Sequence, residues 1–216
     1  KLRNNSWVFH LAALISVIYQ LHVKDNMQDV SGIMYAGAAI AAVFVGDLIS
    51  LFIFWELTAI TSVFLIYARR TERSATVGTR YMVIQVASGV ILLFGVMLWY
   101  KSTGSIMFGQ PFTDDWQQIG MFVDPDSRTP INLGAWLILL AFGIKAAFPF
   151  MHNWLQDSYP EATVTGTVFL SAFTTKLAIY ALARGFAGTS FLIPVGLVMT
   201  LFPIVFAVIE NDLRRV

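Results

Sequence analysis

Residues 142–157 read FGIKAAFPFMHNWLQD, and this stretch decides the fold. It begins inside a long apolar run, yet it places Lys145 four residues before Pro149 and His152 three residues after that proline. Because proline has no backbone N–H, Pro149 cannot donate to the carbonyl of residue 145, and its ring clashes with that carbonyl. We therefore expect a helix that is broken at Lys145.

The rest of the chain has the composition of a membrane protein. Of its 216 residues, 57% are hydrophobic and 12% are charged, and the mean hydropathy is +0.69, whereas about a quarter of the residues in soluble domains are charged. A hydrocarbon core about 30 Å thick needs roughly 20 apolar residues per helix. The sequence predicts an all-α membrane protein with about seven transmembrane helices, near residues 5–22, 31–47, 48–68, 80–100, 132–150, 160–187 and 191–212.

Two other interpretations of the apolar segments fail. The segments are too long for β-strands, which in lipid would also have to close into a barrel of short alternating strands. The first segment has no small-residue cleavage site and is followed by VKDNMQDV, so we expect a retained span, not a removed signal peptide.

The residue types present argue against several functional classes. Cysteine is absent, which excludes disulfides, thiolate-held zinc, iron–sulfur clusters and covalent haem. The histidines, His10, His22 and His152, are too scattered for a metal-ligand spacing, so we predict neither a metal nor a cofactor. A net charge of +1 and the lack of a glycine-rich phosphate loop argue against a nucleic-acid partner.

The charges in the loops predict an orientation. The stretch ARRTERSATVGTR carries four arginines, and short loops rich in Lys and Arg stay in the cytoplasm. The 69–80 loop is therefore predicted to be cytoplasmic, and the 101–131 loop to be external. We expect the external loop to be a solvated connector, and the protein to be an integral protein of the bacterial inner membrane.

Three ionisable residues lie well inside apolar segments: Glu56, Lys145 and Lys176. A charge at a helix centre costs about 2.5–3.5 kcal/mol on insertion scales, so these residues are not present for stability. The helical neighbours of Glu56 are apolar, so its partner must come from another helix. A purely structural ion pair and a transport role both account for one glutamate and one lysine.

The second lysine favours transport. Two ammonium groups beside one carboxylate leave an uncompensated positive charge, and both burial and like-charge repulsion favour a neutral lysine. A buried lysine that gains and loses a proton is a relay station, so we predict proton relay by Glu56, Lys145 and Lys176.

Several nearby side chains are candidates for supporting roles. His152 either passes protons between Lys145 and the cytoplasm or is an interfacial histidine bonded to a loop. Thr174 and Thr175 either hold water beside Lys176 or bond back to their own helix, and Tyr180 is a further candidate for hydroxyl support. The stretch PFMHNWLQDSYPEA predicts a short second half-helix and a turn.

Four motifs carry a family resemblance. In order, LFIFWELTAITSVFLI, IKAAFPFMHNWLQDSYPEA, GTVFLSAFTTKLAIYALARGF and VIENDLRRV resemble the first half of the antiporter-like subunits shared by Mrp-type multisubunit sodium/proton antiporters, respiratory complex I and membrane-bound hydrogenases. The match covers roughly residues 31–216, and the sequences of the motifs are closest to those of the D-type subunit of the Mrp-type antiporters.

The resemblance implies a domain organisation. Family members contain two five-helix repeats of inverted topology, so residues 31–187 would form the first repeat, with the broken segment as its discontinuous helix. Residues 1–30 would then be a peripheral first helix. Residues 188–216 would be a further transmembrane helix placed before a second repeat, and the chain looks like the N-terminal half only.

The resemblance also implies roles and partners. Glu56 matches the family's membrane glutamate, Lys145 the lysine of the broken helix, and Lys176 the connecting lysine of the next helix. The expected function is proton translocation in a multisubunit cation (sodium)/proton antiporter, with other membrane subunits as partners. One alternative is a proton-pumping subunit of a redox-driven complex, either an NADH:quinone oxidoreductase or a membrane-bound hydrogenase. Another is a structural scaffold subunit whose ion pair only fixes helix packing. Hydrolytic chemistry is unsupported, because no nucleophile, base and orienting group occur at a workable spacing.

Overall fold

The computed structural model describes residues 2–109 and 119–211, which form eight α-helices and no strand. The helices are α1 (Leu2–Gln20), α2 (Asn26–Phe44), α3 (Leu48–Tyr67), α4 (Glu72–Thr103), α5 (Leu133–Ala146), α6 (Asn153–Ser158), α7 (Val164–Gly185) and α8 (Leu192–Ile209). Helices α2, α3, α4, α7 and α8 are long and apolar enough to cross a membrane, and Trp7–Gln20 and Leu133–Ala146 are shorter apolar helices. The predicted all-α membrane fold is confirmed.

Polar residues at the helix starts explain several boundaries. The fourth span is expected near residues 80–100, but α4 begins at Glu72. The reason is a capping box, in which the Thr71 hydroxyl accepts from the Ser74 N–H and the Ser74 hydroxyl accepts from the Thr71 N–H, both at 3.0 Å. Asn132 and Thr163 cap α5 and α7 in a similar way, each through one side-chain bond to a backbone N–H.

The discontinuous helix lies where the sequence predicts it. Helix α5 has 14 residues, which corresponds to about 21 Å at 1.5 Å per residue and is less than the hydrocarbon core of about 30 Å. It ends at Ala146, and Ala147 (φ 62°) and Phe150 (φ 69°) then adopt left-handed backbone angles. The chain resumes as the six-residue α6, so irregular backbone directly follows Lys145.

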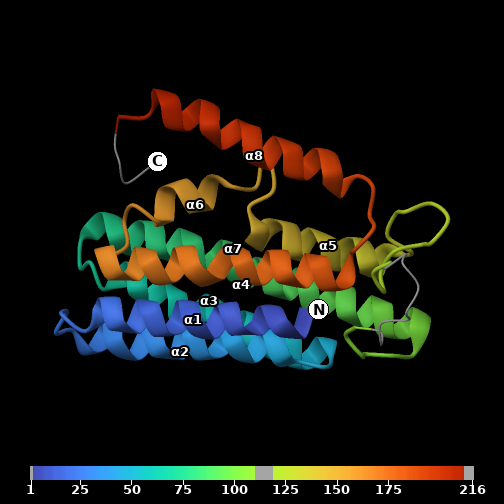
Figure 1. Cartoon of the computed structure of the whole chain (residues 1–216), viewed down its shortest axis with the longest axis horizontal. Helices are drawn as coiled ribbons and strands as arrows, with labels where there is room; N and C mark the ends of the chain where they lie inside the picture. Colours follow the sequence, from blue (N-terminus) through green and yellow to red (C-terminus); the bar gives the residue numbers. More distant parts are fainter. Residues whose placement is uncertain (1, 110–118, 212–216) are drawn as a thin grey trace.

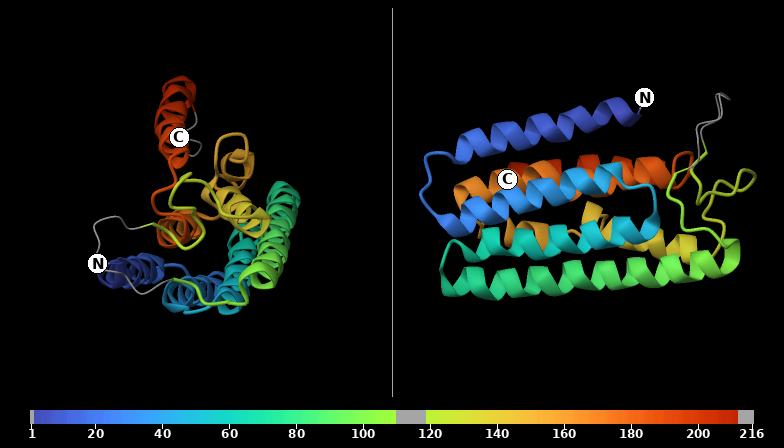
Figure 2. Two further views of the ribbon diagram at one scale, coloured as in Figure 1. Left: turned by 90° about the vertical axis from the view of Figure 1, so that its right-hand side faces the viewer. Right: turned by 90° about the horizontal axis from the view of Figure 1, so that it is seen from below.

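The helices form a bundle around one core. Helix α3 packs between α2 and α4, and α7 packs against α1, α2, α3 and α5. These helices run along the long axis of the molecule, while α6 and α8 lie on one side of it (Figure 1). Helix α8 stands apart from the bundle in the end-on view (Figure 2) and has no buried residue.

The loop after α4 differs from the expected solvated connector. Phe108 (1% exposed) and Phe122 (0% exposed) insert between Trp99 on α4, Phe142 on α5 and Phe186 after α7. The expectation is wrong for these parts of the loop, because aromatic side chains distant in sequence complete one end of the core. Residues 110–118 lie outside the described ranges.

Candidate functional site

Lys145 is buried in the last turn of α5, with 1% of its surface exposed. Its ammonium donates to the Thr58 hydroxyl at 2.7 Å and to the Trp55 carbonyl at 2.9 Å, both on α3. The Nζ atom also lies 4.3 Å from the centroid of the Trp55 ring, a position that stabilises a cation through the ring quadrupole. All three contacts are to uncharged groups.

Glu56 lies beside this site on α3 and is only partly buried. Its side chain occupies the space that Gly89 leaves open on α4, where a Cβ on the glycine would lie 1.4 Å from the Glu56 Oε1 atom. The carboxylate interacts electrostatically with Lys145, but the two groups form no direct salt bridge. The predicted pairing of Glu56 with a lysine of another helix therefore stays a prediction, because the structure contains no ion pair between them.

Some buried polar atoms of α3 and α4 have no hydrogen-bond partner in the protein. Within the described ranges, these atoms are Glu56 Oε1, both amide atoms of Gln85, and Trp99 Nε1. Gln85 is 0% exposed and lies one helical turn before Gly89. Buried polar groups without protein partners are the places where ordered water is found. Sequence reasoning missed Gln85, although a glutamine inside the apolar run YMVIQVASGVILL is a visible signal.

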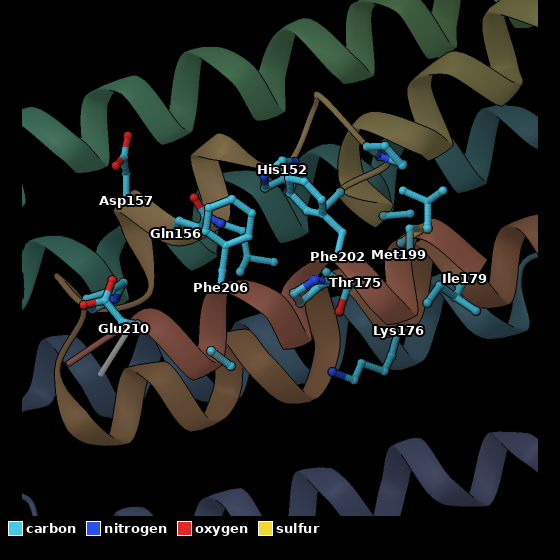
Figure 3. A pocket seen from close by; sticks show the side chains of 18 of the residues that line it. His152, Gln156, Asp157, Thr175, Lys176, Ile179, Met199, Phe202, Phe206 and Glu210 are labelled. Atoms are coloured by element: carbon cyan, nitrogen blue, oxygen red, sulfur yellow. The ribbon is translucent and has the colours of Figure 1, made fainter. Parts of the chain in front are cut away.

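Lys176 lies on a different side of α7 from the Lys145 site. It lines a pocket of about 590 Å³ between the α5–α6 segment, α7 and α8, together with Pro149, His152, Thr175 and Glu210 (Figure 3). The Lys176 residue is exposed. The pocket also reaches Ala146 and Ala147, so it touches the backbone beside Lys145, but the Lys145 ammonium points the other way, toward α3.

The supporting candidates are divided between these two regions. His152 lines the Lys176 pocket and packs on Phe202 of α8, with ring centroids 5.4 Å apart. Thr174 is buried and hydrogen-bonds to the hydroxyl of Tyr35 on α2. Tyr180 donates to the Val43 carbonyl at 3.1 Å and thereby ties α7 to α2.

Ion pairs gather at the end of the bundle where α3 joins α4; the predicted 69–80 loop lies here, although its residues from Glu72 onward belong to α4. Arg69 and Arg73 both contact Glu161, at 3.2 and 3.0 Å. Arg80 pairs with Asp157 at 3.1 Å, so the loop and the start of α4 are tied to the α6–α7 segment. These pairings join residues far apart in sequence, and no local pattern predicts them.

Asp25 fastens the start of α2 at this same end. It pairs with Arg70 at 3.1 Å and caps α2 by accepting from the Met27 N–H. The pKa of Asp25 lies below its ordinary value, mainly because the Gln28 side chain donates a hydrogen bond to the carboxylate. The Met27 N–H and the Arg70 charge lower this pKa less, and burial opposes them by raising it.

Together, the fold and the site define an α-helical integral membrane protein with ionisable side chains held in its interior. Across residues 2–109 and 119–211, no group of three His, Asp or Glu side chains is arranged to hold a metal ion. The chain belongs to the family described as "NADH:quinone oxidoreductase/Mrp antiporter, TM", which it matches over residues 45–216. The family predicted from the four motifs is confirmed.

The relatives include subunits of sodium/proton antiporters and subunits of NADH-quinone oxidoreductases. The chain is 31% identical over 218 residues to an Na(+)/H(+) antiporter subunit of Alkalihalophilus pseudofirmus, a match that covers 95% of this chain and 26% of the relative. It is 29% identical over 184 residues to the "NADH-quinone oxidoreductase subunit N" of Desulfitobacterium hafniense, covering 82% and 36%. The chain therefore spans about a quarter to a third of the length of these curated relatives.

A solved structure shares the fold. A chain of respiratory complex I from Thermus thermophilus aligns with a TM-score of 0.78 and 20% identity, over 97% of this chain and 46% of that chain. That neighbour is a subunit of a multisubunit membrane complex.

Proposed function

We propose that this chain belongs to a proton-translocating membrane subunit of a multisubunit complex, in which Glu56, Lys145 and Lys176 carry protons. The observation that supports the proposal best is the environment of Lys145, which is buried among uncharged hydrogen-bond partners while a carboxylate stays close without pairing directly. Such a lysine exists in two charge states at modest cost, which is what a relay station requires.

A scaffold role fits this geometry less well. A charge pair that only fixes helix packing gains most from direct contact and from filled hydrogen-bond positions. Here Glu56 Oε1 has no hydrogen-bond partner, and the Lys145 ammonium is bonded to a hydroxyl and a carbonyl instead of the carboxylate.

The location of Lys176 supports its part in the proposal. Its side chain lines the pocket beneath α8, and the pocket extends to the helix break after Lys145. His152 lies in the same pocket, so it is placed to exchange protons with Lys176 and with the end that carries the 69–80 loop, which we propose to be cytoplasmic. The exposed apolar surface of α8 fits contact with lipid or with another membrane subunit.

We further propose that the complex is a sodium/proton antiporter of the bacterial inner membrane, and a redox-driven proton pump is the second candidate. The two candidates differ in what drives proton movement in the purified complex: a sodium gradient, or the oxidation of an electron donor. Both use the same charges in this chain.

The proposal is tested by proton flux in inverted vesicles that contain the intact complex. Lys145→Met keeps most of the side-chain volume and removes the charge, and Lys101→Met on the exposed end of α4 is the matched control. We expect Lys145→Met to abolish flux at normal assembly and the control to behave as wild type. Unchanged flux would overturn the proposal, and loss of assembly in the Lys145 variant alone would favour the scaffold.

A further inference from the structure

A buried tryptophan connects the two halves of the discontinuous helix. Trp154 lies in α6 and is only 2% exposed. Its indole Nε1 donates to the Ile144 carbonyl of α5 at 3.0 Å. This bond crosses the helix break, since α5 ends at Ala146 and α6 begins at Asn153. Because Ile144 directly precedes Lys145, the bond holds the turn of α5 that carries the lysine.

The way in which α5 ends explains why the Ile144 carbonyl takes a side-chain donor. In an uninterrupted helix this carbonyl would accept from the backbone N–H of Phe148, four residues later. The Phe148 N–H donates instead to the Gly143 carbonyl at 2.9 Å, and the Ala147 N–H reaches the Ile144 carbonyl at 3.2 Å. This pair of bonds is the Schellman pattern of a helix end. The Trp154 indole therefore supplies a shorter hydrogen bond to a carbonyl that the break leaves with a long one.

Aromatic contacts fix the Trp154 ring in place. The ring lies 5.6 Å from that of Tyr81 on α4 and 6.2 Å from that of Tyr159, measured between centroids. The Tyr159 hydroxyl in turn donates to the Leu170 carbonyl of α7 at 2.9 Å. The indole is thus held by packing against α4 and through a residue tied to α7, so its N–H is a fixed point for the end of α5.

The contacts of Lys145 depend on the position of this same turn. The ammonium bonds to the Thr58 hydroxyl at 2.7 Å and to the Trp55 carbonyl at 2.9 Å, and N–H···O bonds weaken beyond about 3.2 Å. We propose that Trp154 is a positioning residue for Lys145, whose indole N–H holds the last turn of α5 where the ammonium reaches its partners on α3. Trp154 acts through the backbone of Ile144.

Packing alone is the structural alternative. A large buried side chain such as Trp154 stabilises the protein whether or not its N–H is bonded. Under this alternative, Trp154→Phe, which keeps an aromatic ring and removes the N–H, lowers the melting temperature. It leaves the proton flux per assembled complex and the pH dependence of that flux unchanged.

The test rests on the proposed function and uses inverted vesicles that contain the intact complex, with flux expressed per assembled complex. Trp136→Phe on α5 is the matched control, because this side chain is 45% exposed and stacks on Phe191. Gly143→Ala disturbs the same turn from its other side, since a Cβ there would lie 2.7 Å from the Phe148 ring. If Trp154→Phe does not assemble, Gly143→Ala takes its place.

We expect Trp154→Phe to lower flux by up to about tenfold, the change in an equilibrium that one hydrogen bond controls. The pH of half-maximal flux should move by up to about one unit, which is the same factor of ten. It moves because a lysine held less firmly beside its α3 partners has a different balance between its two charge states. Glu56, the charged group that acts on Lys145, is unchanged in this variant. Trp136→Phe should match wild type in both measurements.

Two results would overturn the positioning role. One is normal flux in Trp154→Phe together with lost flux in Lys145→Met, which leaves the proposed function standing. The other is a lower flux in Trp154→Phe with an unchanged pH dependence, which assigns the side chain to packing. Normal flux in Lys145→Met as well would overturn both the positioning role and the proposed function.

Discussion

Gly89→Ala tests whether the position of the Glu56 carboxylate controls proton movement. The new Cβ would lie 1.4 Å from Glu56 Oε1 and 2.5 Å from Cδ, whereas ordinary contacts begin at 3.4 Å. The carboxylate must therefore retreat by about 2 Å. Because the displaced atoms are the free end of a flexible side chain, the helices themselves need not move.

The size of the effect follows from Coulomb's law. For two unit charges about 4 Å apart at an effective dielectric constant of 20, the interaction is about 4 kcal/mol, and at about 6 Å it is about 2.8 kcal/mol. The coupling between Glu56 and Lys145 then changes by at most about 1.4 kcal/mol, which is a factor of ten in any equilibrium that it controls. Folding gains from the same substitution, since Gly in a helix interior is less stable than Ala by about 0.5–1 kcal/mol.

The assay compares proton flux and assembly in Gly89→Ala, Gly37→Ala and wild type. The Gly37 variant is the control because a Cβ there meets no atom within 4 Å. We expect flux to fall by up to about tenfold in Gly89→Ala with normal assembly, and to stay unchanged in the control. Wild-type flux in Gly89→Ala would refute the reasoning that the glycine holds the carboxylate at a working distance.

Two further predictions concern the end that holds the 69–80 loop. Glu161→Gln should lower the melting temperature more than Asp157→Asn does. The Glu161 side chain is 11% exposed and pairs with two arginines, whereas the Asp157 side chain is 47% exposed and pairs with one. Equal melting temperatures in the two variants would contradict this prediction. Asp25→Asn should lower stability at neutral pH, where the lowered pKa of Asp25 keeps the carboxylate charged. The ordinary pKa of an aspartate is about 3.9. The stability that the Asp25 charge contributes is complete above this ordinary pKa and is lost as the pH falls through the lowered pKa of the folded protein, so the difference between Asp25→Asn and wild type should vanish in acid. A difference in melting temperature that does not depend on pH would contradict this prediction.

The sequence predicts much of the fold because its signals are local. Long apolar runs specify helices, and Pro149 specifies the break after Lys145 without reference to any other part of the chain. Glu56 and Lys145 are recognisable because a charge in an apolar run is conspicuous wherever its partner lies. The family motifs add the order of these residues along the chain.

The missed features depend on which helix faces meet. Gln85, Tyr81 and Ser62 look like ordinary members of their helices until α3 and α4 pack and bring two hydroxyls within 2.8 Å. Phe108 and Phe122 lie in a stretch without periodicity, so their burial follows only from the core that α4, α5 and α7 create. Arg69 and Glu161 are joined at 3.2 Å across 92 positions of sequence, a separation that no local pattern bridges.

The distance between Glu56 and Lys145 is what connects these observations into one mechanism. A direct ion pair with its charges about 3 Å apart would hold the charged lysine with about 5.5 kcal/mol at an effective dielectric constant of 20, and each proton transfer would have to overcome that attraction. The structure instead seats the carboxylate against Gly89 and bonds the ammonium to Thr58. The proton-bearing nitrogen therefore contacts the Thr58 hydroxyl, while a rotation of the Glu56 side chain changes the distance between the carboxylate and this nitrogen. Gly89→Ala changes that distance, whereas Lys145→Met removes the proton-bearing nitrogen. If the mechanism holds, the first variant slows transfer in graded fashion and the second abolishes it, and the double variant is no slower than Lys145→Met alone.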